Sequence, residues 1–297
     1  MKYTGTTYRP PYEADSLLVQ VTQGCNHNSC SFCTMYRDVP FAVEELAQVE
    51  HDLLEARAVY RTVKRIFLLN GDAFSLGFSR LEAIGKKIIK IFPEIETIAS
   101  YASIESIARK TDEELQELRR LRFNGMNVGL ESGHAETLTL LGKNYTLEKA
   151  ERELLRLKSF GYEFCLNIIV GVGGTKYTVE HAAASARLIN KVQPWMIFLA
   201  TLFLTEGSPL YAMAQAGEFE ENTAGDNLLE EERLLRALEL KRTFLLGMHT
   251  SNAVPLAGYL PEDKERLLTS LARGVAALDE DFLAARPKRG MEGRYVS

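Results

Sequence analysis

The sequence predicts an α/β protein: a partial (β/α)6 barrel of the TIM type, followed by a C-terminal helical extension. Six short apolar runs recur between residues 16 and 210, and most of them end in Gly, Asn, Asp or Ser. Segments with helical periodicity lie between these runs. Short apolar runs that alternate with helices are typical of buried parallel strands joined by helical crossovers.

The elements follow in order along the chain. The predicted strands are residues 16–24, 65–72, 95–103, 125–133, 163–171 and 196–204. The predicted helices between them are residues 43–60, 78–92, 111–122, 134–142 with 147–161, and 179–192. Thr111 and Glu114 have the spacing of a capping box, and Gly161 stands where its helix should end.

Two closures of such a sheet are possible, an open doubly wound sheet or a barrel. A doubly wound dinucleotide fold requires G-x-G-x-x-G after the first strand, and the sequence QGCNHNSC lacks it. Six consecutive units of similar length favour the barrel, with its functional loops at the carboxyl ends of the strands. Polar residues do gather there, as QGC, NGD, YAS, LESG, VGVGG and LTEG.

The pattern changes after residue 210. Residues 230–248 and 261–285 each have the periodicity of a long amphipathic helix, and the turn-rich segment 249–260 separates them. We therefore expect residues 1–210 to form the barrel and residues 211–297 a helical extension of the same domain. The last stretch, residues 286–297, is expected to be a loose tail.

Composition narrows the class of protein. Hydrophobic residues make up 46% of the chain, charged residues 25%, and the formal net charge is -5. These values are ordinary for a globular protein and do not favour a nucleic-acid partner. The N-terminus has no apolar secretion signal, and the longest apolar runs are too short to cross a bilayer. We expect a cytoplasmic protein without a membrane partner.

Three of the four cysteines lie in one polar loop, VTQGCNHNSCSFCTMY, as Cys25, Cys30 and Cys33. Clustered thiolates of this kind hold soft metals or iron–sulfur clusters. Four interpretations compete: a zinc site with His27 or another fourth ligand, a [2Fe–2S] cluster with Cys165 as the fourth ligand, a [4Fe–4S] cluster with one open iron, and three unmetallated thiols. Bunched cysteines do not resemble a disulfide framework, which favours a reducing compartment.

Strand geometry excludes the [2Fe–2S] cluster. Cys165 lies about six residues before the predicted strand end at Gly171, which places it nearly 20 Å down the barrel at roughly 3.3 Å per residue. The polar residues between Cys25 and Cys30 argue against three buried thiols. Zinc and the open-iron cluster remain, and the spacing favours the cluster.

The loop resembles the cluster-binding motif of the radical S-adenosylmethionine (SAM) superfamily. The usual motif is C-x3-C-x2-C with an aromatic residue before the last cysteine, which Phe32 matches here, although one extra residue separates Cys25 from Cys30. The resemblance covers most of residues 16–210. NGD at 70–72 is similar to the Gly-Gly-Glu strand end, 166–175 to the fifth-strand motif, and 204–211 to the segment after strand six. Residues 125–146 resemble the coproporphyrinogen-oxidase-like and elongator-like branch.

This resemblance implies an activity. Cys25, Cys30 and Cys33 would hold a [4Fe–4S] cluster whose free iron takes the amine and carboxylate of SAM. An electron from a low-potential donor, of flavodoxin or ferredoxin type, would then cleave SAM to methionine and a 5′-deoxyadenosyl radical. That radical would abstract hydrogen from a small organic substrate. Such chemistry implies anaerobic handling.

The resemblance also implies a set of SAM-binding residues. They are Phe32, Asn70, Gly71, Asp72, Ser100, Glu131, Lys143, Asn167, Gly171, Val172 and Gly173. Residues 70–72, with Ser100, would meet the SAM ammonium, and Lys143 its carboxylate. Glu131 and Asn167 would bind the ribose hydroxyls, and residues 171–173, bordered by Phe32, the adenine. Structural alternatives are that Asp72 caps the helix after it and that Lys143 is a solvated helix-end cation.

The substrate site is expected on the extension. Segment 247–260 would fold back over the strand ends, with His249, Ser251 and Asn252 lining the pocket, and Arg9 and Tyr12 of the N-terminal segment closing the other side. Alternatively, His249 caps the helix that precedes it.

An alternative function is a non-catalytic metal carrier or sensor that binds zinc or a cluster. The shortage of cysteines disfavours a second cluster, and the short segment before residue 16 disfavours a cobalamin methyltransferase. His27 is not expected to bind iron.

Overall fold

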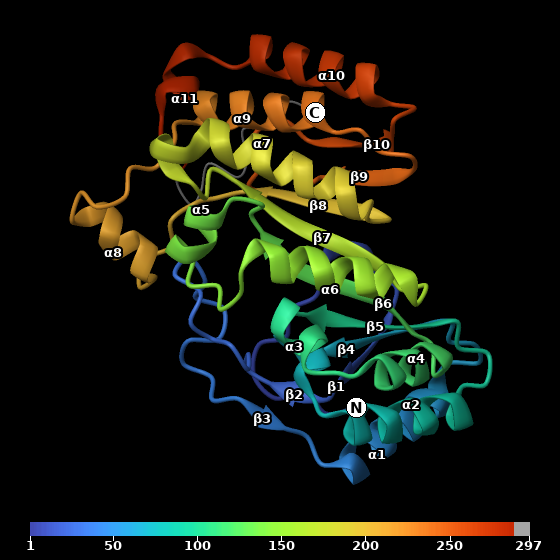
Figure 1. Ribbon diagram of the computed structural model, residues 1–297. Helices are drawn as coiled ribbons and strands as arrows, with labels where there is room; N and C mark the ends of the chain where they lie inside the picture. Colours follow the sequence, from blue (N-terminus) through green and yellow to red (C-terminus); the bar gives the residue numbers. More distant parts are fainter. Residues whose placement is uncertain (288–297) are drawn as a thin grey trace. The chain divides into compact units, whose positions relative to one another are not determined.

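The computed structural model describes residues 1–287, which fall into two compact units (Figure 1). The first unit comprises residues 1–28, 35–129 and 152–164, and the second comprises residues 29–34, 130–151 and 165 onward. Of the expected tail 286–297, all but the first two residues lie outside the described part of the chain.

The first unit contains parallel strands in the order β1, β4, β5, β6. Their bounds are β1 Leu17–Gln20, β4 Arg65–Leu69, β5 Thr97–Ala102 and β6 Phe123–Glu131, the last two residues of β6 belonging to the second unit. The helices are α1 Leu46–Val59, α2 Phe78–Ile91, α3 Ile104–Ala108, α4 Asp112–Arg120 and the larger part of α6 Leu147–Ser159, with short 3-10 turns η1 Pro11–Glu13 and η2 Ala73–Ser75. Strands β2 Thr22–Gln23 and β3 Ala42–Val43 form a separate antiparallel pair.

Both faces of these strands are buried, as the unbroken apolar runs predicted. Phe67 and Leu69 of β4 pack with Ala99 of β5 on one face. The alternate residues Ile66 and Leu68 are also fully buried. Helices must therefore cover the second face, and the amphipathic pattern of α2 and α4 supplies the apolar surface to do so.

The second unit contains β7 Glu163–Val170 from Cys165 onward, β8 Met196–Thr201, β9 Thr243–Gly247 and β10 Leu256–Leu260. Strands β7, β8 and β9 are parallel, and β10 pairs antiparallel with β9. The helices are α5 Ala135–Leu140, α7 Gly174–Val192, α8 Pro209–Gln215, α9 Ala224–Ala237, α10 Lys264–Ala277 and α11 Glu280–Ala284. Helices α7 and α9 pack together, and α10 packs on α9 (Figure 1).

The six predicted strands and the helices between them are confirmed. The capping box is present, because Thr111 Oγ1 accepts from the Glu114 amide and Glu114 accepts from the Thr111 amide. Gly161 follows α6 with a positive φ of 75°. No helix within the described residues has the length and apolarity that crossing a bilayer requires.

The extension departs from its prediction as a helical segment. Residues 230–248 are not one helix, because α9 ends at Ala237 and the chain turns extended at Leu238. The apolar run 243–247 instead pairs with β8 as strand β9, and β10 completes a hairpin. A run of this length suits either a helix or a strand, and pairing with a neighbouring strand decides between them. The second predicted helix is also divided, into α10 and α11.

Candidate active site

The three clustered cysteines are partly exposed and form no disulfide. Cys30 and Cys33 lie in the second unit, where the Cys33 amide donates to the Cys30 carbonyl at 3.2 Å. Ser31 between them anchors the turn, since its amide donates to the Leu141 carbonyl at 3.0 Å and its carbonyl accepts from the Leu210 amide at 2.9 Å. The segment therefore has a fixed backbone and accessible sulfurs.

Cys25 lies in the first unit, against the loop that follows β4. A Cβ atom added to Gly71 would lie 2.6 Å from Cys25 Cβ and 2.6 Å from the Gly24 carbonyl oxygen. No side chain fits at that distance, so only glycine lets the two loops approach. The structure thus brings the predicted NGD segment to the first cysteine.

Asn70 is fixed by hydrogen bonds within the first unit. Its Nδ2 donates to the Thr22 carbonyl at 3.3 Å, and its amide donates to Thr22 Oγ1 at 3.0 Å. Its Oδ1 accepts from the Tyr36 hydroxyl at 3.4 Å. Asn70 is buried, and its side chain joins the end of β4 to the chain on either side of the cysteine loop.

Asp72 does not cap α2, whose N-cap is Gly77. Its carboxylate instead accepts from the Ser103 hydroxyl at 2.6 Å and from the Ser103 amide at 3.3 Å. Burial raises the pKa of Asp72, and these hydrogen bonds oppose the shift. Ser100, the predicted assistant, is buried with its hydroxyl 4.0 Å from Met126 Sδ. Sequence reasoning missed Ser103, although the YAS at the end of β5 pointed to that place.

Glu131 and Lys143 form a buried ion pair in the second unit. Lys143 Nζ lies 3.2 Å from Glu131 Oε1, and the two side chains are 10% and 11% exposed. Lys143 is therefore not the solvated cation of the alternative interpretation. Burial lowers the pKa of Lys143, but the charges of Glu131, Tyr145 and Cys30 outweigh it and raise the pKa. Lys143 Nζ also lies 5.8 Å from the centre of the Phe32 ring.

Glu131 ends β6 with a φ of 65°, in the left-handed region that residues other than glycine seldom adopt. Such a conformation costs about 1–3 kcal/mol and persists where the surroundings impose it, often at functional sites.

Asn167, near the middle of β7, has a side-chain oxygen that is buried without a hydrogen-bond partner among the described residues. Buried polar atoms are nearly always paired, so an orphaned amide oxygen is a position where a ligand donor fits. The role of Asn167 as an acceptor from a ribose hydroxyl stays a prediction.

The loop after β7 contains Gly171, Val172 and Gly173. Val172 is buried in one apolar cluster with Leu141, Leu202, Leu210 and Phe219, and Phe32 packs against this cluster. The structure therefore brings together two of the residues predicted to border the adenine. Gly171 has a φ of 82°, and its amide donates to Glu230 Oε1 at 2.8 Å.

The predicted substrate residues lie between β9 and β10, beside the carboxyl end of β8. Ser251 Oγ accepts from the Thr201 amide at 2.9 Å. Asn252 is buried; its Nδ2 donates to the Leu199 and Gly247 carbonyls, both at 2.9 Å, and its Oδ1 accepts from Thr201 Oγ1 at 3.0 Å. These bonds join the end of β9 to β8, so the Asn252 side chain stabilises this part of the sheet.

His249 follows strand β9, so it does not cap a preceding helix as the alternative interpretation had it. Its Nδ1 lies 2.7 Å from Ser251 Oγ, and its ring meets the Phe198 ring edge to face at 5.8 Å.

Arg9 and Tyr12 lie in the first unit, on the segment that precedes β1. Arg9 donates to the Pro10 carbonyl at 3.3 Å, and the Tyr12 hydroxyl accepts from Asn127 Nδ2. The adjacent Glu13 accepts from Nε of Arg65, the first residue of β4, at 2.8 Å. The segment therefore meets β4 at the end opposite to the loop 70–72.

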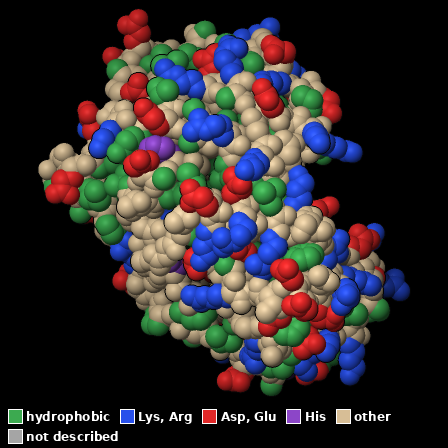
Figure 2. Space-filling model, viewed as in Figure 1, with side chains coloured by type: hydrophobic (Ala, Val, Ile, Leu, Met, Phe, Trp, Pro, Cys, Tyr) green, Lys and Arg blue, Asp and Glu red, His purple; other side chains and the backbone are tan. Residues whose placement is uncertain are grey.

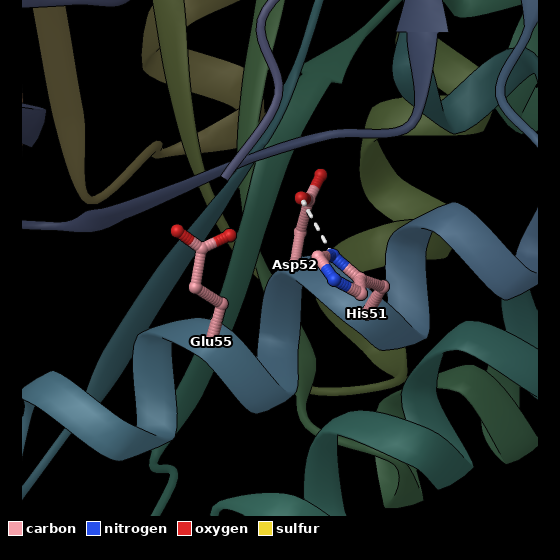
Figure 3. Close-up of side chains that lie close together, drawn as sticks. All are labelled: His51, Asp52 and Glu55. Carbon is pink, nitrogen blue, oxygen red and sulfur yellow. Dashed lines mark ion pairs between the residues drawn. The ribbon is translucent and has the colours of Figure 1, made fainter.

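A second group of ligand-type side chains lies on α1, where His51, Asp52 and Glu55 are close together (Figure 3). Asp52 Oδ1 already accepts from the Lys2 amide at 3.0 Å and from Gln48 Nε2 at 3.1 Å, and it lies 3.8 Å from His51 Nδ1. His51 is exposed. These contacts explain the group without a bound cation.

Comparison with known proteins identifies the family. The sequence profile of the radical SAM superfamily matches residues 19–189. No curated protein matches the chain in sequence.

Solved structures share the fold. They include the radical SAM methyltransferase TsrM from Kitasatospora setae, solved with cobalamin and a [4Fe–4S] cluster (TM-score 0.56, 17% identity, covering 68% of this chain and 40% of that one). Methylornithine synthase PylB is similar over 86% of this chain and 68% of its own (TM-score 0.56, 15% identity). The oxidase HemN from Escherichia coli is similar over 74% and 50% (TM-score 0.52, 16% identity).

This chain thus spans about 40% of the length of the methyltransferase. The shared fold confirms the α/β partial-barrel prediction. With the profile match over more than half of its length, the chain belongs to the radical SAM superfamily of enzymes.

Proposed function

We propose that the protein uses a [4Fe–4S] cluster to cleave SAM reductively and that the resulting 5′-deoxyadenosyl radical abstracts hydrogen from a small organic substrate. The observation that carries this proposal is the state of Cys25, Cys30 and Cys33: all three are partly exposed and form no disulfide, and backbone hydrogen bonds hold the turn that contains Cys30 and Cys33. A bound cluster would supply the electron that breaks the sulfonium C–S bond.

The residues present fit such a group. Thiolates are the donors that iron–sulfur clusters require. Gly71 lets the loop after β4 pack directly against Cys25, where a Cβ atom would clash. Gly142, at a φ of 69°, packs closely against the cysteine segment in the same way, since a Cβ atom there would lie 3.0 Å from the Ser29 carbonyl oxygen.

The second unit supplies groups that suit SAM itself. Lys143 forms an ion pair with Glu131 and also interacts electrostatically with Cys30. Its positive charge would attract the SAM carboxylate. Asn167 Oδ1, which has no hydrogen-bond partner within residues 1–287, would accept from a ribose hydroxyl. Val172 and Phe32 offer an apolar surface of the kind that binds an adenine ring.

The partners follow from the reaction. A small molecule would be the substrate, and a low-potential protein of flavodoxin or ferredoxin type would reduce the cluster. We do not propose a nucleic-acid partner, and basic and acidic side chains are interspersed on the face that Figure 2 shows.

Metal analysis after anaerobic purification tests the proposal. We expect about four irons and four sulfides per chain, lost together in Cys30→Ala. Cys165→Ala is the matched control, because Cys165 is buried in β7 and should not affect the cluster. Bound zinc without sulfide would instead support a metal carrier and contradict the enzyme.

A further inference from the structure

A buried polar network lies behind the loop 171–173 in the second unit. Its centre is Glu230 of α9, which is 1% exposed. Glu230 Oε1 accepts from the Gly171 amide at 2.8 Å and lies 2.8 Å from His181 Nδ1 of α7. Glu230 Oε2 accepts from Asn222 Nδ2 at 3.3 Å. Both carboxylate oxygens therefore act as acceptors from this loop and its neighbours.

The partners of Glu230 are themselves held in place. Thr178 Oγ1 lies 3.1 Å from Asn222 Oδ1 and 3.0 Å from the Gly174 carbonyl oxygen, and its single proton can be donated to one of these two acceptors at a time. The network thus begins at Gly171, passes through α9 and α7, and returns to Gly174. It clamps the loop at both ends while the Val172 side chain packs with the Phe32 cluster.

Burying a carboxylate is costly in free energy, because removing a charge from water is unfavourable unless the charge is fully hydrogen-bonded. A neutral side chain in α9 could fill the same space. What the carboxylate adds is a strong, directional acceptor for the amide of Gly171, a glycine at a φ of 82°.

We propose that Glu230 is a positioning residue for SAM: by holding the Gly171 amide it sets the loop 171–173 in the shape that receives the adenine. This inference rests on the proposed function, which places the adenine at that loop. Glu230 contacts the loop through the Gly171 amide, and in this proposal it affects SAM only through the loop.

Glu230→Gln tests this at nearly constant shape. An amide has one oxygen and one NH2 group, so a glutamine must turn a donor either toward the Asn222 NH2 group or toward the Gly171 amide. One hydrogen bond is lost in either orientation, and the acceptor that remains is uncharged.

Glu231, the next residue on α9, provides a matched control. It is also buried, and within the described part of the chain its Oε1 has no hydrogen-bond partner. Burial, together with the charge of Glu230, raises the pKa of Glu231 to about 8, so glutamine closely mimics its neutral form.

The first measurement is hydrogen exchange of residues 171–174 in the reconstituted holoenzyme. The second is the Kd for SAM, with iron content and Tm as checks. We expect Glu230→Gln to speed exchange in this loop and to raise the Kd between about threefold and tenfold, at unchanged iron content. Turnover at saturating SAM should stay near wild type, so that the loss appears in KM. Glu231→Gln should stay within about twofold of wild type.

Glu230→Asp keeps the charge but shortens its reach, and it serves if the glutamine variant folds poorly; the same direction of change is expected. Faster exchange with an unchanged Kd would overturn the inference and leave Glu230 as scaffold. A wild-type protein that binds iron and sulfide but no SAM would contradict the proposed function as well, which separates the two failures.

Discussion

Two asparagines of parallel strands, Asn70 after β4 and Asn167 on β7, differ in the hydrogen bonding of their side chains. Asn70 follows β4 in the first unit, and its side-chain oxygen and nitrogen both have partners in Tyr36 and Thr22. Asn167 lies on β7 in the second unit, and its side-chain oxygen has no partner among the described residues. The hydrogen bonds of the Asn70 side chain are made within the protein, whereas we propose that the Asn167 side-chain oxygen accepts from a ligand.

The difference shows how to distinguish a polar group that supports the fold from one that is available to a ligand. A polar group whose hydrogen bonds are satisfied internally stabilises the shape of a loop, and its loss should appear in the free energy of unfolding. A polar group that the protein leaves unpaired adds little to stability, so its loss should appear in ligand binding instead. Single substitutions can therefore show whether a residue serves the fold or ligand binding.

The largest effect is expected at the Glu131–Lys143 pair. Glu131→Gln leaves the Lys143 cation buried without its counter-charge, which should lower the free energy of unfolding by about 3–5 kcal/mol, measured by denaturant titration. It should also weaken SAM binding. Adding Lys143→Met should recover much of the stability but not the SAM affinity; recovery of both would show that the pair serves only the fold.

Asn70→Ala should come next. It removes the bonds to the Thr22 carbonyl and the Tyr36 hydroxyl and leaves both groups buried, so we expect a loss of about 1–3 kcal/mol in the same titration. Asn167→Ala is its matched control and should unfold like wild type. Equal destabilisation by the two variants would remove the distinction between them.

Glu231 should make the free energy of unfolding depend on pH, because its carboxyl group is buried. Its folded pKa of about 8 lies above the ordinary value of 4.5, so folding favours its neutral form. The contribution to stability is therefore complete below about pH 4.5, declines as pH rises toward 8, and is constant above that. Glu231→Gln should lack this decline and be more stable than wild type near pH 8 by about 1–3 kcal/mol. Parallel stability curves for the two proteins between pH 5 and 8.5 would refute this.

The smallest effect concerns Asn167 alone. Asn167→Ala should raise the Kd for SAM about fivefold to tenfold, as expected for one lost hydrogen bond, while iron content and Tm stay unchanged. Isothermal titration under anaerobic conditions measures it. An unaltered Kd would mean that its oxygen does not meet SAM.

The sequence predicted the strands and helices up to residue 204 because their signals are local. Apolar runs that end in polar turn residues mark buried strands, and Thr111 with Glu114 marks a helix start. It failed at residues 243–247, because an apolar run of five residues becomes a strand only where another strand, here β8, is available. No periodicity within the segment carries that information.

The site shows the same limit. The resemblance to the superfamily placed Glu131 and Asn167 at strand ends and Lys143 just past the helix that follows strand four. Only the structure shows that Glu131 pairs with Lys143, that Asn167 lies near the middle of β7, and that its Oδ1 has no hydrogen-bond partner among the described residues. Ser103 and Glu230 were missed because their partners, Asp72 and the Gly171 amide, are distant in sequence. Side chains that support a site from behind leave no motif of their own.

The central claim is that this chain cleaves SAM reductively through a cluster held by its three clustered cysteines. The most direct measurement is the formation of 5′-deoxyadenosine and methionine from SAM by the anaerobically reconstituted, dithionite-reduced protein, followed by chromatography. We expect both products in equal amounts from the wild type and from Cys165→Ala, and neither from Cys30→Ala. Bound iron and sulfide without 5′-deoxyadenosine, or equal formation of it by Cys30→Ala, would contradict the claim.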